Sequence, residues 1–532
     1  MRNIFLSAAA LCLVVSVSAQ ETYDNTSLLN KDLNGTARYV GMGGAMEALG
    51  ADISTISSNP AGIGLCRRSV VSGSLGVVSQ PEAKSFRNAD KTNMSFDQIG
   101  FVYSTKLMGR NNGLNFAFNY HKSKNFDYIL STSDRLNNAS QSKLSYLKGY
   151  TGVFNPKPNS NGTIIAEDVY GNPSLSFNQL DYLYYNTVLT DADGVYRYNN
   201  ANGYMFDRGN TGYIGEYNFN ISGNVNDRFY WGITAGLHDV HYKGVSSYTE
   251  TLVNENGTSV GNTTIDDERK ITGTGFDAKF GVIFRPVADS PFRVGLYVNT
   301  PIWYDLKTSN YTSINNGSSV GMYDKGQINE VYDFKLRTPW VFGVSLGHTV
   351  GNFLALGATY EYSDYGTTDT RINDGDYYDW YWDEYYETSS RDEVMKSHTE
   401  RTLKGVHTLK LGAEYKFADA FSLRLGYNYI SSMYEKDGFK DGTLDSYGSY
   451  YSSSTDYTNW DSTNRFTVGF GYNYRKWNFD LAYVYTQTKG DFYPFMSYYP
   501  SASEDAALEN IANGVKVNNK RDQLLMTVSY RF

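Results

Sequence analysis

The stretch FDAKFGVIF, residues 276–284, alternates apolar and polar side chains with a period of two. Its apolar positions are Phe276, Ala278, Phe280, Val282 and Phe284. Asp277 and Lys279 lie between them. Successive side chains of a strand point to opposite faces of a sheet, so this alternation is typical of a β-strand with one apolar face. The same pattern recurs at 421–429, 466–474 and 477–485 and predicts an all-β chain.

The lengths of the strands and of their connections distinguish a membrane barrel from a soluble sandwich. The alternating segments are around ten residues long, as a tilted strand that crosses a membrane requires. Short turns such as HTVGN (348–352) alternate with long polar segments, near 243–272, 302–330, 366–404, 431–463 and 487–520. Short turns on one side and long loops on the other are typical of outer-membrane barrels. The sequence therefore predicts a transmembrane antiparallel β-barrel of about fourteen strands with long extracellular loops.

Charged residues within the predicted strands support the barrel. Lys335, Arg337, Glu361, Lys410, Glu414, Arg424 and Asp480 all lie opposite the apolar stripe of their strand. A charge that faces lipid at mid-membrane costs roughly 2–4 kcal/mol. We therefore expect all of these side chains to face the lumen.

The composition excludes several classes of protein. The chain has 532 residues, a net charge of −9 and a mean hydropathy of −0.47. The low hydropathy excludes a multi-helix membrane protein, and the negative charge argues against nucleic acid, which binds basic surfaces. Tyrosine is abundant, with 48 residues against 28 Phe. Tyrosine rings suit surfaces that are apolar at one end and wet at the other.

Both ends of the chain carry export features. Residues 1–19 combine Arg2, a short apolar segment and small residues up to Ala19, which predicts a cleaved signal peptide. The mature chain then holds only Cys66 and cannot form an internal disulfide. At the other end, Tyr530 and Phe532 lie on the apolar face of DQLLMTVSYRF, which resembles the recognition signal of the outer-membrane barrel assembly machinery. We expect export to the outer membrane of a Gram-negative cell, with that machinery as a partner.

The glycine-rich stretch ARYVGMGGAMEALGADISTISSNPAGIGL, residues 37–65, looks at first like a phosphate-binding loop. A dinucleotide-binding loop has the spacing G-x-G-x-x-G, and residues 41–46 lack the third glycine. A P-loop needs Gly-Lys followed by Ser or Thr, which this stretch also lacks. An exported segment meets little ATP or NAD. Phosphate binding is therefore not expected here.

The order and spacing of this stretch resemble the N-terminal region of the FadL/TodX family of outer-membrane transporters for long-chain fatty acids and other hydrophobic compounds. The matching positions are Gly41, Gly43, Gly44, Asn59, Pro60, Ala61 and Gly62. The resemblance implies an N-terminal hatch, residues 20–66, folded inside a barrel formed by residues 67–532. Glycine suits such a plug because it tolerates a close approach of backbone to the wall and positive φ. The alternative is a loose periplasmic arm.

The largest expected insertion, residues 123–211, lies between the third and fourth strands. In the family, long loops at this place form a groove that collects the hydrophobic ligand. The resemblance therefore implies a substrate pathway over Tyr146, Leu147, Tyr150, Leu180, Leu183 and Tyr184. The alternative is that these residues only pack the loops against one another. In the family a kink in the third strand also opens the wall sideways, and the third strand here, 113–122, offers only Gly113 as a breaker.

The resemblance also implies a function, that of a passive outer-membrane channel for hydrophobic compounds, above all long-chain fatty acids. A buried carboxylate needs a partner. Lys335 and Arg337, near the outer end of their strand, are the expected first contacts of a fatty-acid head group. The alternative is that they pair with lumen acids such as Asp333 and Glu361. We expect a monomer that contacts the lipid bilayer and lipopolysaccharide, with no cofactor, no metal and no enzymatic activity.

Two other functions stay open. Haem capture would need an exposed axial His or Tyr, and His398 is the only histidine well inside an expected outer loop. A surface adhesin would use the tyrosine-rich loops to hold a polymer or a host surface. The acidic and aromatic stretch at 374–393 suits Ca²⁺ binding, a sugar face or a solvated loop. His238 and His241 stand three residues apart, so on a strand they face opposite sides and do not form a metal site.

Overall fold

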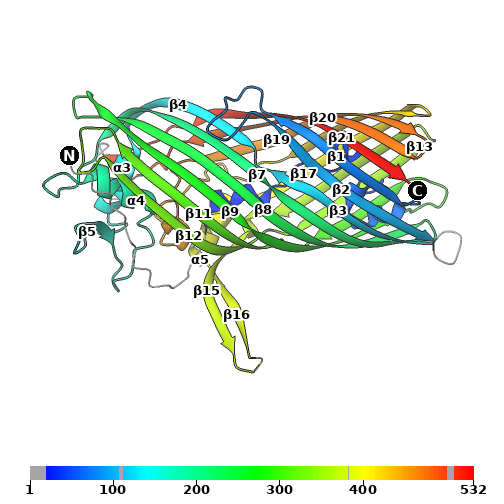
Figure 1. Ribbon diagram of the computed structural model, residues 1–532, viewed down its shortest axis with the longest axis horizontal. Helices are drawn as coiled ribbons and strands as arrows, with labels where there is room; N and C mark the ends of the chain where they lie inside the picture. The colour runs from blue at the N-terminus through cyan, green and yellow to red at the C-terminus, as the bar shows by residue number, and fades with distance from the viewer. Residues whose placement is uncertain (1–19, 107–111, 382, 500–507) are drawn as a thin grey trace.

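The chain folds into a closed antiparallel barrel of 14 strands, as predicted (Figure 1). The structure, a computed structural model, describes residues 20–106, 112–381, 383–499 and 508–532, so the expected signal peptide lies outside the described residues. The last strand, β21 (Val515–Arg531), pairs with the first, β1 (Val70–Ser79). This pairing removes the two free edges that an open sheet would leave.

The other wall strands follow one another around the barrel. They are β2 (Thr92–Lys106), β3 (Gly113–Asn125), β4 (Tyr128–Ala139), β7 (Asn200–Val225), β8 (Phe229–Val253), β9 (Ser259–Phe284), β10 (Arg293–Asn299), β11 (Trp303–Asn316), β12 (Lys325–Arg337), β13 (Val341–Val350), β14 (Leu354–Asp364), β15 (Asp369–Asp379), β17 (Gly405–Ala418), β18 (Phe421–Ile430), β19 (Tyr457–Tyr474) and β20 (Trp477–Tyr493). Some wall strands are interrupted, so that β3 continues as β4, β10 as β11, β12 as β13 and β14 as β15. β16 (Glu384–Arg391) pairs with β15 in a hairpin that projects from the side of the barrel (Figure 1).

Several wall strands are much longer than a membrane crossing requires. β7, β8 and β9 have 26, 25 and 26 residues, whereas a crossing takes about 9–11 residues. The segments near 243–272 and 302–330, which the sequence analysis assigned to long loops, are largely strand, so that assignment was wrong. Only residues 254–258 and 317–324 connect these strands at their outer ends.

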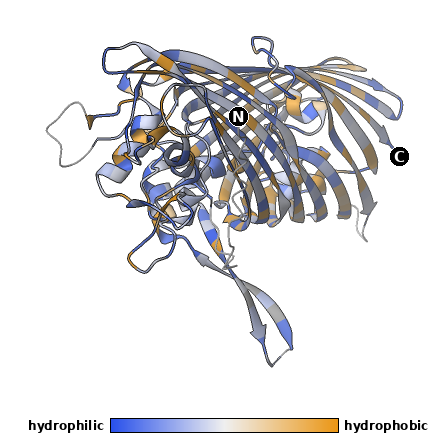
Figure 2. Cartoon of the chain, turned by 60° about the vertical axis from the view of Figure 1, so that its left-hand side comes forward, coloured by the Kyte–Doolittle hydropathy of each residue, from blue (hydrophilic) through white to orange (hydrophobic). Residues whose placement is uncertain are grey.

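The lower part of the barrel has an apolar outer face and a polar lumen. On β9, Phe276, Phe280 and Phe284 are 44%, 43% and 44% exposed, whereas Asp277 and Lys279 are buried. Exposed apolar side chains at the same level of other strands include Leu237, Leu296, Phe342, Leu411, Leu425, Phe470, Leu481 and Met526. Figure 2 shows the alternation as hydrophobic and hydrophilic bands along the wall strands. We call this outer surface the apolar belt, because its side chains suit contact with lipid.

Above the apolar belt the polarity of the wall is inverted. Farther along β9 the outer face carries Asp266, Glu268 and Lys270, while Ile265 and Ile271 are buried inside. The period of two continues, but the apolar side chains now point inward because the outside is water. This inversion explains why the sequence analysis did not identify these segments as strands, since it searched for stripes that face lipid.

Most of the expected lumen charges are found inside the barrel. Arg424 donates hydrogen bonds to Glu414 at 2.6 Å and to Asp480 at 2.7 Å, and Lys410 lies 2.8 Å from Glu361. The orientation predicted for these residues is therefore correct. Within the described chain, no helix is long and apolar enough to cross a membrane.

Residues 20–66, called here the N-terminal segment, lie inside the barrel (Figure 1), and nearly all of them are buried. They form α1 (Thr22–Leu29), α2 (Ala37–Gly41), η1 (Ile53–Ser57) and η2 (Pro60–Leu65). Ion pairs connect the segment to the wall, with Arg38 at 2.9 Å from Glu414 and Glu47 at 3.0 Å from Lys410. A loose periplasmic arm does not describe this arrangement.

The outer end of the barrel is closed by loops and short helices. Wall strands extend to Ala139 and resume at Asn200, so the insertion that leaves the wall is shorter than the predicted 123–211. It contains α3 (Gln141–Tyr150), β5 (Pro156–Pro158), β6 (Ile164–Ala166), α4 (Gln179–Tyr184) and the π-helical turn η3 (Tyr185–Leu189). Elsewhere at this end lie η4 (Tyr365–Thr367), α5 (Glu393–Thr402) and α6 (Tyr447–Tyr450).

Candidate functional site

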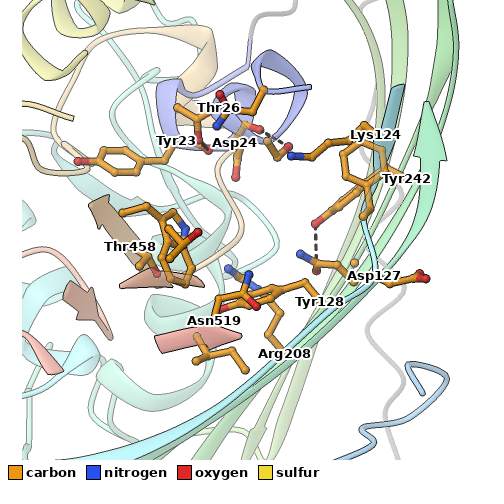
Figure 3. Close-up of a pocket in the computed structure, with 18 of the residues that line it drawn as sticks. Tyr23, Asp24, Thr26, Lys124, Asp127, Tyr128, Arg208, Tyr242, Thr458 and Asn519 are labelled. Atoms are coloured by element: carbon orange, nitrogen blue, oxygen red, sulfur yellow. Dashed lines mark hydrogen bonds between the residues drawn. The ribbon is translucent and has the colours of Figure 1, made fainter. Parts of the chain in front are cut away.

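A cavity of about 290 Å³ lies in the lumen between α1 and the wall (Figure 3). We call it the outer cavity. Tyr23, Asp24 and Thr26 of α1 form one side, and Lys124 and Tyr128 form part of the other. A cavity near 300 Å³ is at the lower end of the range for small-molecule sites.

The wall beside the outer cavity is interrupted at Phe126 and Asp127, between β3 and β4. We call this interruption the wall break. The register of β3 against β7 already shifts between Lys122 and Lys124, and β4 pairs with β7 on one side only in the described sheet. Gly113, the only breaker that the sequence offers in this strand, begins β3, and the wall break lies at the other end of that strand.

The Gln80 side chain bridges the gap that the wall break leaves. Gln80, just after β1, accepts a hydrogen bond from Ile129 N at 2.8 Å and donates one to Asn519 Oδ1 at 2.9 Å. Gln80 therefore connects β4 to β21, two neighbouring strands that do not pair with each other in the described sheet. Glu82 and Lys520 add an exposed ion pair at 2.6 Å, which contributes little energy.

The outer cavity combines apolar rings with buried ion pairs. Its apolar lining includes Phe126, Leu130, Ile271, Ile430, Met433 and Trp460. Trp460 packs edge-on against Tyr128, with ring centroids 5.8 Å apart. Arg269 lies 2.5 Å from Asp24 of α1, and Arg208 lies 2.7 Å from Asp456. The lining can therefore hold both an apolar chain and a charged group.

One carboxylate of the N-terminal segment, Asp32, meets cations from several strands. Arg521 Nη1 lies 3.4 Å from Asp32 Oδ2, and Arg465 Nη2 lies 3.6 Å from Asp32 Oδ1. Burial alone would raise the pKa of Asp32, but the charges of Lys124, Arg521 and Arg465 outweigh it and lower that pKa to about 2. Asp32 is therefore ionised at every pH at which the protein would work.

A second, deeper cavity of about 170 Å³ lies between residues 29–34 and the wall. Next to it, Glu216 and Asp277 hold the ammonium group of Lys279 at 3.0 and 2.6 Å. His238 Nε2 lies 3.3 Å from Asp277 Oδ1. His241 faces the opposite, outer side, where its ring meets Asp239 at 2.9 Å, as the strand period predicted. Lys31 Nζ also lies 3.0 Å from Glu216 Oε2. Because Lys279 and Lys31 together balance the two carboxylates, this cluster is a buried salt-bridge network.

The glycines of the first motif let the N-terminal segment lie directly on the wall. Gly43 and Gly44 have φ of 63° and 79°, which other residues rarely adopt. The wall also presents glycines here. A Cβ on Gly357 would lie 1.9 Å from Ala45 O, and one on Gly426 would lie 2.2 Å from Gly43 N. Gly41 is also close to the wall, since a Cβ there would lie 3.0 Å from the Cα of Gly469.

The second motif is seated in a similar way. Asn59 caps η2 by accepting a hydrogen bond from Ala61 N at 3.2 Å, and Pro60 is the first residue of that helix. A Cβ on Gly232 of β8 would lie 2.4 Å from Pro60 C. Within the segment, Gly62 packs against η1, where a Cβ would lie 2.4 Å from Thr55 Oγ1. Both motifs therefore fix the position of the segment in the barrel.

The structure contradicts the predicted orientation of Lys335 and Arg337. Phe334 and Leu336 of the same strand are fully buried, so Lys335 and Arg337 face outward. The Arg337 side chain is 45% exposed, with Nη1 at 3.9 Å from Asp369 Oδ2. This part of β12 stands above the apolar belt, where the polarity of the wall is inverted. These cations are therefore not lumen contacts for a substrate.

On the fatty-acid hypothesis of the sequence analysis, replacing both Lys335 and Arg337 by Ala should therefore leave uptake unchanged within about twofold, because exposed charge pairs contribute little. The measurement is uptake of a long-chain fatty acid and of its uncharged methyl ester by cells that carry the variant. Loss of acid uptake with ester uptake retained would show that the outward orientation is incorrect.

Most of the residues predicted to line an outer groove are packed inside the outer insertion. Leu180, Leu183 and Tyr184 are buried in one apolar cluster of the outer insertion, and Leu147 is fully buried. Tyr146 packs against the same cluster and stacks on Tyr150, which is 63% exposed, at 5.9 Å. This arrangement matches the alternative in which the loops pack against one another.

The sequence analysis missed Asp32, Lys124, Arg465 and Arg521. Arg465 and Arg521 lie opposite the apolar stripes of β19 and β21, so strand parity was a usable signal for two of the cations. Asp32 belongs to no motif. Its meeting with these cations depends on how the N-terminal segment is folded inside the barrel.

Comparison with known proteins bears on the fold. No family model matches the sequence, and no curated protein matches it. A FadL homologue from Pseudomonas aeruginosa is similar in structure, with 12% identity over 95% of this chain and 100% of that chain and a TM-score of 0.50. The toluene transporters TbuX of Ralstonia pickettii and TodX of Pseudomonas putida have 13% and 12% identity, each over 94% of this chain and 99% of that chain, with TM-scores of 0.45.

Identity this low supports a conclusion about fold alone. The closed barrel of 14 strands and the near-complete coverage of the FadL homologue agree with the resemblance found in the glycine-rich stretch. The chain therefore has the fold of the FadL/TodX type.

Proposed function

We propose that the protein is a passive outer-membrane channel for hydrophobic small molecules, with long-chain fatty acids as the first candidates. The observation that carries this proposal is the outer cavity, which combines apolar rings with buried charges and lies beside an interrupted wall strand. A polar, water-filled lumen would not suit hydrophobic molecules. The N-terminal segment fills this lumen. We therefore infer that the channel selects its substrates by their polarity and not by their size alone.

The packing around α1 argues against an open aqueous pore. Leu28 and Leu29 of α1 share one buried apolar cluster with Phe334, Leu336 and Leu403 of the wall and loops. Water and ions cross such a cluster poorly because their hydrogen bonds would be lost. An apolar molecule can pass when the side chains move, because it replaces one apolar contact by another.

The wall break suggests where the molecule leaves the barrel. Phe126 N donates to Gly212 O of β7 at 2.9 Å. Across the sheet, Gly212 of β7 pairs with Tyr242 of β8, and Tyr242 pairs with Ile271 of β9. The break is therefore in register with Ile271, five residues beyond Phe276 along β9 and on the outer side of the apolar belt. We infer a lateral exit there into the outer leaflet, in which Gln80 must release β4 or β21.

The test is to fill the outer cavity. Thr458 lies on its lining (Figure 3), and Thr458→Trp should lower uptake of labelled palmitate by about tenfold or more, because the indole takes the place of the ligand. Thr274→Trp is the matched control, because Thr274 is exposed at the rim of the apolar belt, where aromatic residues are common. Equal uptake by the two variants, with both barrels assembled, would exclude the outer cavity from the route.

The haem alternative loses its expected ligand. His398 is buried in α5, where Nδ1 meets Thr22 Oγ1 at 3.0 Å and Nε2 meets Phe439 O at 3.0 Å. Burial also lowers the pKa of His398. Both ring nitrogens are engaged, so His398 is not placed for axial ligation of an incoming haem.

The β15–β16 hairpin supports surface binding as a second candidate function. Tyr377, Trp380 and Tyr381 are 55%, 77% and 71% exposed on this projection. Exposed rings beside acidic residues suit the faces of sugars, which stack on aromatic side chains. Deleting residues 374–387 should abolish adhesion to a glycan surface without changing palmitate uptake. If adhesion is unchanged, the hairpin is not a binding element.

A further inference from the structure

The short-turn end of the barrel, where the C-terminus lies (Figure 1), is rich in cations. Short turns face the periplasm in outer-membrane barrels. Cations at this end include Arg67, Arg68, Arg228, Arg285, Arg475, Lys476 and Arg531, whereas the acids in the same described turns are Asp227, Asp289 and Asp419. The chain as a whole has a net charge of −9. Positive charge is therefore concentrated at one end of an acidic protein.

Two of these cations, Arg475 and Lys476, form the turn between β19 and β20, and both are exposed. The Arg475 guanidinium lies over the ring of Tyr474, 5.4 Å from its centroid, and Lys476 Nζ lies 5.9 Å from the centroid of Tyr530. No described carboxylate lies within 4.0 Å of either charged group. The rings hold the two cations in place without neutralising their charge.

The rings beside this turn belong to the outer face of the wall. Tyr474 pairs with Trp477 across the turn, and Trp477 pairs with Tyr530 on β21, so the three rings share one face. Along β20 the same face continues into the apolar belt at Leu481. Tyr474, Trp477 and Phe532 are 50%, 44% and 57% exposed. Aromatic girdles of this kind mark the membrane interface, so the turn stands at the level of lipid head groups.

The backbone of the turn provides a second observation. Arg475 has a φ of 54°, a region that Asn and Gly adopt more readily than arginine. The turn between β7 and β8, at the same end of the barrel, places Asn226 and Asp227 in this region, with φ of 53° and 54°. Two-residue hairpin turns usually have Asn, Asp or Gly at such positions. Arginine is therefore less favourable for this turn than asparagine, and the hairpin alone does not account for its side chain.

We propose that Arg475 and Lys476 bind the phosphate of an anionic phospholipid, of the phosphatidylglycerol class, in the inner leaflet of the outer membrane. We call these two cations, with Tyr474, Trp477 and Tyr530, the rim site. The inference goes beyond the proposed function, because it concerns the lipid around the barrel and not the molecule inside it. A zwitterionic phospholipid also has a phosphate, but its own ammonium group offsets that charge. The rim site should therefore prefer a lipid with a net negative charge.

A lipid fits the rim site better than a soluble acidic protein, because each cation lies over a ring of the outer wall. The same arrangement occurs once more at this end. The Arg228 guanidinium lies 5.8 Å from the centroid of Phe284, which is 44% exposed on the outer face of β9. Arg228 also donates a hydrogen bond to Pro286 O at 3.0 Å, so its guanidinium is already engaged. The rim site has two cations without such a partner, and its rings can contact the acyl chains of the bound lipid.

The experiment is native mass spectrometry of the purified full chain in an uncharged maltoside detergent, with equal amounts of phosphatidylglycerol and phosphatidylethanolamine that have the same acyl chains. The wild type should retain phosphatidylglycerol in preference by about tenfold or more. Arg475→Asn and Lys476→Gln should each lower this preference about fivefold, the contribution of one cation near an anionic surface. Asparagine tolerates the positive φ of position 475, so the hairpin should form at least as well. Arg475→Lys keeps the charge and should stay within about twofold of the wild type.

Two controls separate the rim site from simpler causes. Lys325 and Lys489 are exposed and lie toward the outer ends of β12 and β20. Replacing both by Gln removes as much charge as the double variant of Arg475 and Lys476, but at the opposite end, and should leave the lipid preference within about twofold. Excess glycerol 3-phosphate should not displace the bound lipid, because it lacks the acyl chains that contact the rings.

Each outcome supports or overturns the inference. Equal retention of the two lipids by the wild type would overturn it in favour of a soluble acidic partner for these cations. The inference is also wrong if the double variant keeps the wild-type preference, if the Lys325 and Lys489 control loses as much, or if glycerol 3-phosphate displaces the lipid. If the double variant does not assemble, Lys476→Gln alone decides in the same way. None of these outcomes bears on the proposed function, because palmitate uptake through the lumen does not involve the rim site.

Discussion

Replacing Phe280 by Lys is expected to prevent assembly of the barrel. Phe280 lies on the outer face of β9 within the apolar belt and is 43% exposed. A lysine that faces lipid at mid-membrane costs roughly 2–4 kcal/mol, a large part of the ~5–15 kcal/mol that stabilises a typical protein. The measurement is the amount of protein in the outer membrane that migrates differently on a gel before and after boiling. The variant should show almost none of that form.

The matched control is Tyr311→Lys. Tyr311 is 42% exposed on the outer face of β11, at a level where the outer face already carries Lys307 and other charges. Lysine there meets water, so assembly should equal that of the wild type. Equal loss in both variants would mean that the apolar belt does not end where the outer polarity changes.

The second large effect is expected from the wall glycines that seat the N-terminal segment. A Cβ on Gly357 or Gly426 would meet the segment's backbone at 1.9 or 2.2 Å, so valine at either position should displace residues 41–45. Valine itself is favourable in a strand, and the barrel should still assemble. In planar bilayers each variant should conduct ions several-fold more than the wild type, because the displaced segment no longer fills the lumen.

Gly73→Val provides the control for conductance. Gly73 also lies in a wall strand, but a Cβ there would meet only Gln98 O, at 3.9 Å. This variant should conduct like the wild type. If Gly357→Val and Gly426→Val also conduct like the wild type while assembled, the N-terminal segment does not block the lumen.

The sequence was most informative where the surroundings of the chain are uniform. Lipid demands an apolar outer face on every strand, so parity alone placed Phe280 outside and Arg424 inside, and both placements are correct. The same rule failed for Lys335 and Arg337, because β12 leaves the lipid and its apolar stripe turns toward the packed interior. The alternation shows which residues share one face of a strand, but it does not show whether that face meets lipid, water or the packed interior.

The glycine-rich stretch showed a related limit. Gly43 and Gly44 were recognised from their motif, but the wall glycines that receive them, such as Gly426, look like ordinary strand residues in the sequence. The charged residues of the outer cavity could likewise not be identified as one site from the sequence, because they come together only in the folded barrel. Arg465 alternates correctly along β19, yet its meeting with Asp32, 433 positions earlier in the chain, follows only from the seating of the N-terminal segment.

Uptake by intact cells tests the proposed channel most directly. A strain without the protein and the same strain expressing it would be given labelled palmitate, methyl palmitate, haem and a small sugar. The account predicts that the protein raises uptake of palmitate and of its ester severalfold and leaves uptake of haem and of the sugar unchanged. Faster sugar uptake would identify a polar pore, faster haem uptake alone would identify a haem receptor, and no change for the two lipids would contradict the proposed function.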